Sequence, residues 1–533
     1  MTIIHSPEIE NNSTLNYNVC VIGAGMCGQI ISSELNNKKV LIIESGSLNF
    51  DKNIQELNGF SSTGLEFRKN NQNRIRQVGG SANLWANQLM LLNKNDYERR
   101  EWIDPSQYSP ISSADLENYY DKAINKIYKK KFENIGNLIK FKKKNNKFIE
   151  KEFTKDNIFD FNNHFWPSKI EKFDIKSNFT KKLLKSKTID LIHNFTATDL
   201  EIDEDRETID FIKIKSGEKR ATVKADFYIL ACGAIENARL LLNNKTKSKI
   251  LDNQNIGKYF MEHPRVNLGL IKSKKKLPIN FLFGMKYNNY SIKQSLTFPK
   301  NYMVKNNLLN SYAFIDPKFN ESDEILFNNF LNGLKILIKK GKLPKLSLKN
   351  FKLKNIAEQI YFKLPPQVSN SILNNLLRIF FQRDSYNFSF DKMDINYQGE
   401  QFPNYKSSIY LSEKCDFYNQ KKTVINWQLC EIDYKTIDHF VKILRDRFKK
   451  HDYLFFEENK NKQITDSSHH MGTTRMSLNT SDGVVDKNCK LHNLKNLYIG
   501  GSSVFRTSGS ANPGLTNMAL SIRLGEYINK IYD

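Results

Sequence analysis

Three glycines and a glutamate near the N-terminus have the residue types and the spacing of a nucleotide-binding loop. Gly23, Gly25 and Gly28 follow an apolar run that ends at Ile22, and Glu44 ends the next apolar run, 21 residues after Gly23. The first glycine permits a tight turn, the second lets a pyrophosphate approach the backbone, and the third lets a helix pack on the strand. The acid is spaced to bind a ribose hydroxyl. We therefore expect a strand, turn, helix and strand that bind a dinucleotide at the helix N-terminus.

A second group of polar and small residues lies in the C-terminal segment. An apolar strand, Leu497 to Ile499, leads into Gly-Gly-Ser-Ser at 500–503, and a loop then ends at Asn512-Pro513. Asn is a favoured helix-capping residue and Pro is favoured at the first helical position, so a helix is expected to begin there. Asn512 is thereby placed beside the positive end of a helix dipole.

The cysteines and the apolar runs indicate where in the cell the protein is expected and whether it binds a metal. The six cysteines form no CxxC pair, which indicates neither a zinc site nor a disulfide framework. No run approaches the roughly 18 apolar residues of a membrane span. The N-terminal residues contain no apolar core of signal-peptide length. We expect a cytoplasmic protein with no metal site.

Composition and charge narrow the class of protein without naming a partner. With 39% hydrophobic and 26% charged residues, the chain can bury a core and is not disordered as a whole. Its 533 residues correspond to three or four domain-sized units at about 150 residues each. The net charge of +24 suits nucleic acid or an anionic membrane. A bias toward Lys, Asn and Ile codons explains the same excess without any partner, and we favour that interpretation.

The elements that position these residues can be outlined from the patterning. A capped helix is expected to start at Ser112 or Ser113. The strand-like runs from 189 to 230 predict an antiparallel meander that leads into a buried strand, Phe227 to Leu230, with a helix after it. Residues 266–464 follow no single pattern. Within them, Leu331 to Lys363 contains nine Lys and one acid, and this amphipathic stretch is either a membrane or partner surface or a solvated face.

Taken in order, the motifs resemble the glucose–methanol–choline (GMC) flavoprotein oxidoreductases from Tyr17 to the C-terminus. The motifs that carry the resemblance are GAGMCG with Glu44, RIRQVGGSANLW, ADFYILACGAIENARLLL, NIGKYFMEHP, EQFPNYKSSIYLS, HHMGTTRM, and NLYIGGSSVF through SANPGLTNMALSIRL. The HHMGTTRM motif and the Asn-Pro pair look closest to the branch of pyranose oxidases and of sugar and polyol dehydrogenases.

The resemblance implies an α/β fold with two interwoven domains. One is a Rossmann-like FAD-binding domain made of residues 1–105, 185–265 and 465–533. The other is a discontinuous substrate domain of α+β type, built on an antiparallel sheet, made of residues 106–184 and 266–464.

The resemblance also implies FAD as the cofactor and the residues that hold it. The ADP half would be held by Gly23, Gly25, Gly28 and Glu44. The remaining contacts lie along the pyrophosphate, the flavin and the adenine: Gly79, Gly80, Ser81, Asn83, Ala197, Gly233, Gly501, Ser502 and Pro513. Where pyranose oxidases tether the flavin through a His before Trp, this chain has Leu84 before Trp85. We therefore expect non-covalent FAD.

Two residues are implied to act on the substrate. His469 matches the family's base, and a histidine suits removal of a hydroxyl proton because its unperturbed pKa is about 6.5. Asn512 matches the second catalytic position, and its amide can donate to the substrate oxygen. The carbon's hydride would pass to flavin N5. His470 is expected to point away, and His263 is expected to be structural.

The resulting hypothesis is an FAD-dependent oxidoreductase that oxidises a CH–OH group of a sugar, polyol or glycan-like alcohol to a carbonyl. A dehydrogenase is favoured over an oxidase, and the electron acceptor, whether a quinone, a protein carrier or oxygen, stays open. Two further departures from relatives are Arg506, where Pro is common, and Gly514, where Thr is common.

Two rival hypotheses remain. One is a basic flavoprotein that binds a membrane or a polyanion with little or no catalytic activity. Peripheral contact with the inner face of the membrane through 331–363 also stays open for the enzyme itself. The other is an NAD-dependent Rossmann enzyme, which leaves the C-terminal motifs without a purpose. Nucleic-acid binding is not expected, because no recognition motif accompanies the charge.

Overall fold

The structure is a computed structural model of the whole chain. It describes the following residues: 3–4, 8–35, 37–68, 73–103, 109–128, 150–154, 156–167, 173–278, 285–287, 290–319, 325, 328–329 and 389–532. The Lys-rich stretch Leu331 to Lys363 lies outside the described residues, so its proposed surface role stays a prediction.

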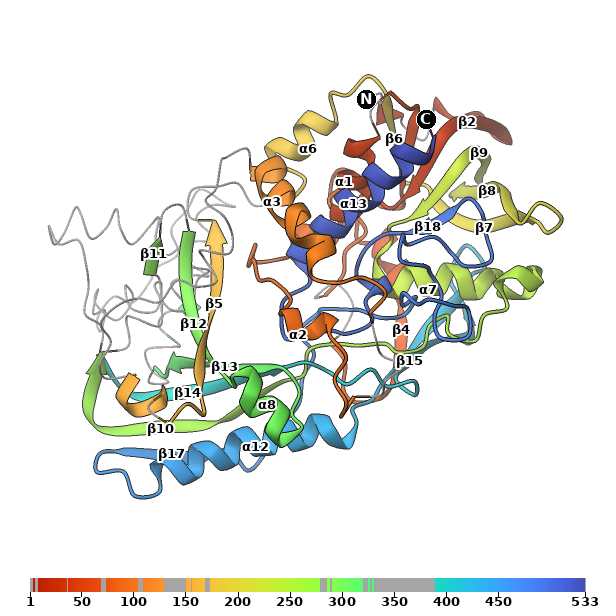
Figure 1. Cartoon of the computed structure of the whole chain (residues 1–533). Coiled ribbons are helices and arrows are strands. Elements are labelled where there is room, and N and C mark those ends of the chain that lie inside the picture. The colour runs from red at the N-terminus through yellow and green to blue at the C-terminus, as the bar shows by residue number, and fades with distance from the viewer. Residues whose placement is uncertain are drawn as a thin grey trace, which may run out of the picture.

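An eight-stranded sheet forms one end of the molecule (Figure 1). Its strands, in spatial order, are β1 (Ile3–Ile4), β6 (Ile189–His193), β3 (Val40–Glu44), β2 (Ser13–Ile22), β9 (Lys219–Leu230), β8 (Thr208–Ser216) and β7 (Thr196–Asp203), with β18 (Leu497–Ile499) also paired with β9. The pairs from β1 to β9 and the pair β9–β18 are parallel, and β9–β8–β7 is antiparallel. Because the central strands are buried on both faces, they are nearly continuous apolar runs.

Helices next to this sheet bring distant segments together. The helix α1 (Met26–Glu34) packs against α13 (Gly514–Tyr532), and α13 packs against α3 (Ala114–Tyr128). A salt bridge from Lys122 to Glu526, with a nitrogen–oxygen distance of 2.6 Å, joins α3 to α13. The remaining helices near this sheet are α6 (Asn178–Leu183) and α7 (Gly233–Asn244).

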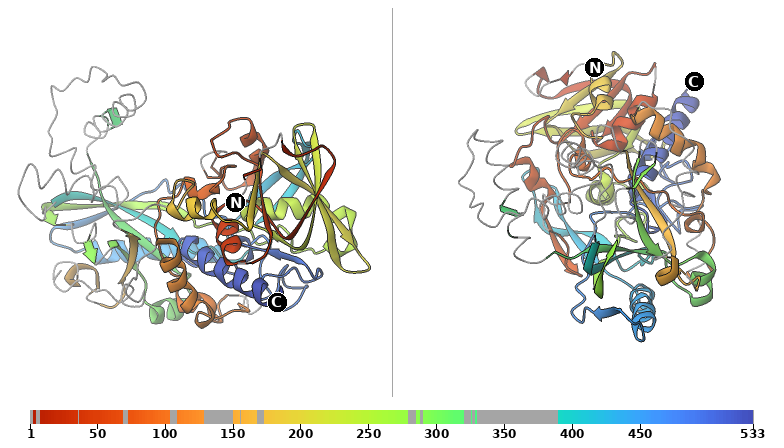
Figure 2. Two further views of the ribbon diagram at one scale, coloured as in Figure 1. Left: turned by 90° about the horizontal axis from the view of Figure 1, so that it is seen from above. Right: turned by 90° about the vertical axis from the view of Figure 1, so that its left-hand side faces the viewer.

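A seven-stranded antiparallel sheet forms the other end (Figures 1 and 2). Its order is β11 (Met285–Tyr287), β12 (Tyr290–Thr297), β13 (Ser311–Pro317), β14 (Ser389–Gly399), β10 (Arg265–Pro278) and β17 (Leu454–Glu458), with β5 (Asp160–Pro167) paired with β12. The amphipathic helix α12 (Glu431–Phe448) buries Phe440 and Leu444 in the core of this sheet, next to Ile395 and Tyr397.

Smaller elements connect the two sheets. A three-stranded sheet pairs β15 (Ser408–Cys415) with β16 (Lys421–Trp427), and β16 in turn pairs with β4 (Phe60–Gly64). The short helices are α2 (Lys94–Tyr97), α8 (Lys300–Asn306), the π-helix η5 (Glu150–Thr154), and the 3₁₀ turns η2 (Ile54–Asn58), η3 (Gly80–Asn83), η6 (Lys245–Lys247), η7 (Lys249–Leu251) and η9 (Ser502–Val504).

The fold class predicted from the sequence is confirmed. One mixed, largely parallel sheet packs against helices, and a separate antiparallel sheet forms the second part of the molecule. The meander expected between 189 and 230 forms for its last three strands, whereas β6 joins the parallel part of the sheet. Helices α3 and α6 fall in a segment assigned to the substrate domain and contact helices beside the eight-stranded sheet. The exact domain boundaries stay a prediction.

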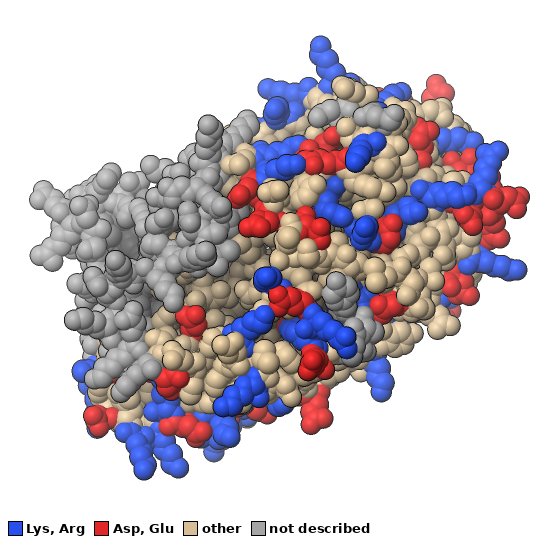
Figure 3. Space-filling view, in the orientation of Figure 1, with Lys and Arg blue, Asp and Glu red and all other residues tan. Residues whose placement is uncertain are grey.

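Charges on the face shown in Figure 3 are mixed in sign. Over the described surface, Lys and Arg side chains alternate with Asp and Glu. Among the described helices, none has the length and apolar character to cross a bilayer.

Candidate functional site

A cavity of about 590 Å³ lies between the two sheets and is in the size range of ligand sites. It begins where the parallel strands of the eight-stranded sheet end, at Ile22, Glu44, Ala231 and Gly500. Ligands of open α/β sheets bind at the carboxyl ends of the strands. The cavity continues to the seven-stranded sheet, where Tyr312 and other residues line it.

The glycine loop at the start of α1 has a backbone conformation and close contacts that residues with a Cβ atom could not adopt. Gly23 has φ of +107°, and a Cβ there would lie 2.6 Å from the carbonyl oxygen of Ala231. A Cβ on Gly28 would lie 1.9 Å from the carbonyl oxygen of Gly23, so only glycine lets the helix pack on the turn. No side chain caps α1 at Gly25, which leaves its first N–H groups to bind an anion.

Glu44 is buried at the end of β3 and faces the cavity. Its carboxylate accepts hydrogen bonds from the backbone N–H groups of Ala24 (2.9 Å) and Gly46 (2.8 Å). A carboxylate has about four acceptor positions, so capacity remains for the hydroxyls of a ribose. Burial raises the pKa of Glu44, and the two backbone donors oppose that rise.

Most of the predicted cofactor residues line this cavity: Gly23, Gly25, Glu44, Gly80, Ser81, Ala197, Gly233, Gly501, Ser502 and Pro513. Three do not and lie behind its wall. Gly28 lies under the loop, and Gly79 adopts φ of +95°. The Asn83 side chain donates to the Val78 carbonyl (3.0 Å) and accepts from the Ile175 N–H (3.0 Å), which fixes the second glycine turn.

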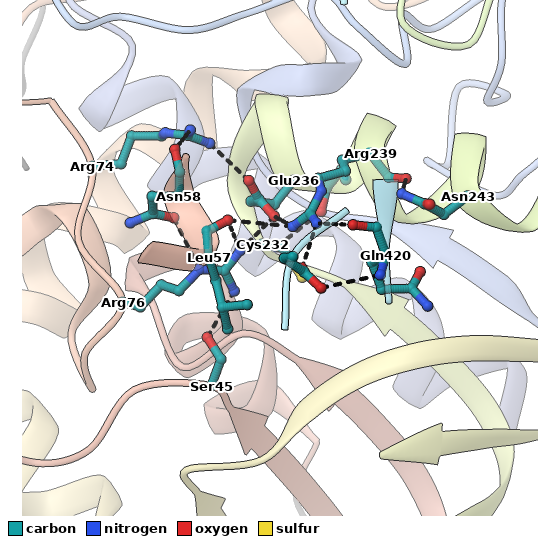
Figure 4. A network of polar contacts seen from close by, with 12 residues as sticks. Ser45, Leu57, Asn58, Arg74, Arg76, Cys232, Glu236, Arg239, Asn243 and Gln420 are labelled. Atoms are coloured by element: carbon teal, nitrogen blue, oxygen red, sulfur yellow. Dashed lines mark hydrogen bonds and ion pairs between the residues drawn. The ribbon is translucent and has the colours of Figure 1, made fainter. Parts of the chain in front are cut away.

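An ion-pair network that sequence reasoning missed lies beside Glu44 and Ser45, at the end of the cavity that we call the nucleotide end (Figure 4). Glu236 on α7 contacts Arg74 (2.8 Å) and Arg76 (2.5 Å), and Arg239 contacts Asp416 (2.6 Å). Burial raises the pKa of Glu236, but the guanidinium groups outweigh it and hold that pKa at about 2. The signal was present as RIR before the second glycine motif and as Glu and Arg three residues apart on α7.

At the opposite end, His469 contacts a second histidine. Its Nδ1 lies 2.9 Å from Nδ1 of His263, and Nε2 of His263 lies 3.2 Å from the carbonyl oxygen of Ser508. The sequence suggested only a structural role for His263. Its motif, MEHP, is separated from His469 by 206 residues, so only the fold brings the two rings together.

These contacts determine which nitrogens carry protons. A carbonyl accepts, so His263 donates from Nε2, and in neutral His263 its Nδ1 is then an acceptor. Nε2 of Gln398 also points at that acceptor, at 3.4 Å. His469 therefore donates from its own Nδ1, which leaves its Nε2 unprotonated. Among the described residues Nε2 of His469 has no hydrogen-bond partner, and His469 lines the cavity.

The side chain of Asn512, like that of His469, is oriented by a hydrogen bond to a neighbouring side chain. Nε2 of Gln398 donates to its Oδ1 at 3.1 Å, so the amide Nδ2 is left as a donor at the cavity wall. Helix α13 begins at Gly514, and its first backbone bond runs from the Asn517 N–H to the Pro513 carbonyl (2.8 Å). The helix start thus agrees with the Asn-Pro expectation to within a residue.

Glu262 anchors the loop that carries His469. Its Oε2 accepts from the backbone N–H groups of His469 (2.9 Å), Ser467 (3.2 Å) and His263 (3.3 Å). Burial and then the nearby Asp466 raise the pKa of Glu262 well above its usual range. His470 also lines the cavity; its Nε2 lies 3.4 Å from Glu262 and its ring packs against Phe67.

Both histidines in contact are neutral near pH 7. Burial lowers the pKa of His263 to about 4. Burial, followed by His263 and Arg265, lowers the pKa of His469 well below its usual value. A neutral imidazole with a bare Nε2 is the form that can accept a proton.

The two departures from relatives have structural reasons. A Cβ on Gly514 would lie 2.6 Å from the ring of Trp85, so glycine makes room for that indole. Arg506 is buried, pairs with Asp482 (2.8 Å), and donates to the Met476 carbonyl (2.8 Å). Leu84, the third departure noted in the sequence, lines the cavity.

Comparison with solved structures identifies the same architecture. Formate oxidase from Aspergillus oryzae RIB40 matches over 98% of this chain and 99% of its own, with a TM-score of 0.54 and 14% identity. Pyridoxine 4-oxidase from Mesorbium loti matches over 96% of this chain and 98% of its own, with a TM-score of 0.50 and 13% identity. At these identities the likeness shows the fold alone. No curated protein matches the sequence.

A sequence match points to a family. Residues 403–521 match the C-terminal GMC oxidoreductase model, a segment that contains both His469 and Asn512. This part of the chain is therefore similar to the GMC oxidoreductases, which are flavoproteins that oxidise CH–OH groups. The cavity fits a flavin dinucleotide, because a glycine loop with free N–H groups and a buried carboxylate suited to a ribose line one continuous space of about 590 Å³.

Proposed function

We propose that this chain is an FAD-dependent enzyme that oxidises an alcohol of sugar, polyol or glycan-like type to a carbonyl, with His469 as the base. The substrate class rests on the resemblance of HHMGTTRM and the Asn-Pro pair to sugar and polyol enzymes. The chemistry rests on the arrangement of His469 and Asn512 at the cavity wall.

FAD would lie along the cavity with its ADP half at the glycine loop and Glu44. When bound, it supplies the acceptor for the hydride that leaves the substrate carbon. We propose that it is held without a covalent bond, because Leu84 occupies the tether position of pyranose oxidases. Release of all flavin by acid or urea, with no flavin left on the polypeptide, checks this.

His469 and Asn512 divide the work on the hydroxyl. The bare Nε2 of His469 takes the hydroxyl proton as the C–H bond gives up its electron pair, so the alcohol loses H⁺ and H⁻ and becomes a carbonyl. The Nδ2 group of Asn512 donates to the same oxygen and fixes its orientation. His263 takes no proton itself and holds His469 in the tautomer that leaves Nε2 free.

The observation that carries this proposal is the chain of contacts from Ser508 through His263 to His469. A buried histidine satisfied on both nitrogens would be a structural residue. Here one nitrogen is satisfied and the other has no partner among the described residues, on a residue that lines the cavity. That pattern is expected of a base and not of a packing residue.

The acceptor is proposed on the resemblance alone. We keep a dehydrogenase as the proposed mode, although the structural neighbours named above are oxidases. Reoxidation of the reduced enzyme by dioxygen, compared with a soluble quinone, distinguishes the two.

The proposal is tested by anaerobic reduction of the purified holoenzyme with a panel of alcohols and sugars, followed by flavin absorbance. We expect a yellow protein that an alcohol bleaches. His469→Ala should slow bleaching by about 10²-fold to 10⁴-fold and keep FAD bound. His439→Ala, on α12 away from the cavity, is the matched control. A colourless protein unable to bind FAD, or bleaching of the His469→Ala enzyme at the wild-type rate, contradicts the proposal.

A further inference from the structure

Arg265 belongs to a row of residues at the end of the cavity that contains His469 and Asn512, which we call the catalytic end after their proposed roles. It begins β10, where it lies opposite Gln398 of β14, and Gln398 lies opposite Tyr312 of β13. Residues directly opposite one another in an antiparallel sheet present their side chains on the same face. All three line the cavity, and Gln398 holds Asn512. Arg265 is therefore on the wall that faces the reacting atoms.

The guanidinium of Arg265 has no ion pair or hydrogen bond among the described residues, and more than a third of the residue is exposed. The acids that line the cavity are Glu44, Glu236 and Asp416, all of which belong to the nucleotide end. Glu44 accepts backbone N–H groups, and the other two are paired with arginines. No acid among the described lining residues is left to neutralise Arg265.

A second arginine increases the positive charge at this end. Arg68 lines the cavity, its backbone N–H donates to the carboxylate of Asp466 (2.9 Å), and its guanidinium forms only a long ion pair with the same carboxylate (3.9 Å from Nε). Both arginines are close enough to His469 for their charges to act on it. The catalytic end thus combines neutral hydrogen-bonding groups with two cations.

We propose that the substrate alcohol carries a carboxylate or phosphate group and that Arg265 binds this anion while the hydroxyl lies at His469 and Asn512. The proposal rests on the function proposed above and narrows its substrate to acidic or phosphorylated sugars and related hydroxy acids. The guanidinium is planar and presents parallel N–H donors that match both anions.

The positive charge of Arg265 also makes the basicity of His469 depend on the charge of the substrate. The titratable and charged groups that act on His469 are His263, Arg265, His470 and Arg68, and the two arginines disfavour a protonated imidazole. An anion bound to Arg265 offsets one of these charges, so the base accepts a proton more readily with an anionic substrate than with a neutral one. Discrimination should therefore be visible in turnover as well as in affinity.

The test compares neutral and anionic probes of the same carbon skeleton on the oxidised holoenzyme. Glucose is compared with gluconate and glucose 6-phosphate, and glycerol with glycerate and glycerol 3-phosphate. Binding is followed by perturbation of the flavin absorbance and by calorimetry, and reduction by anaerobic bleaching. The carboxylate and phosphate arms separate the two sources of the anion.

We expect at least one anionic probe to bind more than tenfold tighter than its neutral partner. Arg265→Gln should remove this preference, and Arg265→Lys should restore part of it, because a charge-assisted hydrogen bond is worth that factor or more. Lys318→Gln is the matched control: it removes one positive charge beside Asp394 in the same sheet but does not line the cavity. FAD affinity should be equal in all variants.

Each outcome decides between the proposals. Equal binding of neutral and anionic probes, or a preference that survives Arg265→Gln, overturns the anionic substrate while alcohol oxidation stands. Loss of FAD from Arg265→Gln also overturns it, since Arg265 would then hold the cofactor. Anion binding that depends on Arg265, with no alcohol able to bleach the flavin, supports the anion site and overturns the proposed oxidation.

Discussion

The two ends of the cavity solve different electrostatic problems. At the nucleotide end, three arginines and two acids form ion pairs, with Glu236 at the centre of Arg74, Arg76 and Arg239. At the catalytic end, His263 and His469 are neutral and joined by a hydrogen bond, and Gln398 orients Asn512. One end is built from buried ion pairs, and the other combines neutral hydrogen-bonding side chains with the charges of Arg265 and Arg68.

The difference corresponds to what each end must do. A cofactor that stays bound through many turnovers needs walls that do not move, and buried ion pairs are costly to break. A base must gain and lose a proton in every turnover, so it must be neutral at rest and held in one tautomer. In the proposed function, the sheet ends and α7 meet the first requirement, and the 467–470 loop with the MEHP segment meets the second.

The largest effect is expected where the nucleotide end is broken. Glu236→Gln leaves Arg74 and Arg76 buried without their counter-ion, which should cost about 3–5 kcal/mol of unfolding free energy and most of the FAD affinity. Urea unfolding and flavin titration measure both. Glu413→Gln removes an exposed acid that pairs with Lys421 and is the control, expected to be nearly silent. Equal stability of the Glu236→Gln and Glu413→Gln proteins would contradict the stabilising role of the Glu236 ion pairs.

The two ends also differ in how far the sequence predicted them. Gly23, Gly25, Gly28 and Glu44 lie in one short segment in which local rules fix the turn, the helix and the next strand. These features depend on neighbours in the sequence, so the glycine turn and its flanking strands and helix could be stated before the structure. The fold class as a whole followed from the resemblance to the family.

The catalytic end depends on contacts that local rules do not contain. His263 and His469 are far apart in the chain, and the row Arg265–Gln398–Tyr312 is created by the strand order β10–β14–β13. The arginines around Glu236 come from two motifs that were noted separately. Residue types were visible in each case, but register and pairing determine which of them meet.

An intermediate effect on the rate is expected when the hydrogen bond between His263 and His469 is removed. His263→Leu removes the acceptor for Nδ1–H of His469 and should lower kcat about 10-fold to 100-fold, with KM, FAD affinity and Tm little changed. His263→Asn places an amide oxygen near the position of Nδ1 and should recover much of the rate. Stopped-flow flavin reduction separates kcat from KM. If His263→Leu and His263→Asn lose the same activity, His263 has only a packing role.

The smallest effect is expected from pH, and it separates the two ends without disabling either. The pKa of His263 is about 4 in the folded chain and near 6.5 unfolded, so the unfolded chain binds more protons between these values. Stability from this group is therefore complete above pH 6.5 and is lost as pH falls, by about 1.4 kcal/mol per pH unit. Glu236, with a pKa of about 2 against about 4.3 unfolded, contributes fully down to about pH 5.

Unfolding free energies are measured at pH 7.5, 6.5 and 5.5. The gap in unfolding free energy between wild type and His263→Asn should become smaller as the pH drops below 6.5. The gap between wild type and Glu236→Gln should stay constant over the same range. A parallel decline of both gaps would mean that the ionised and neutral ends are not electrostatically distinct.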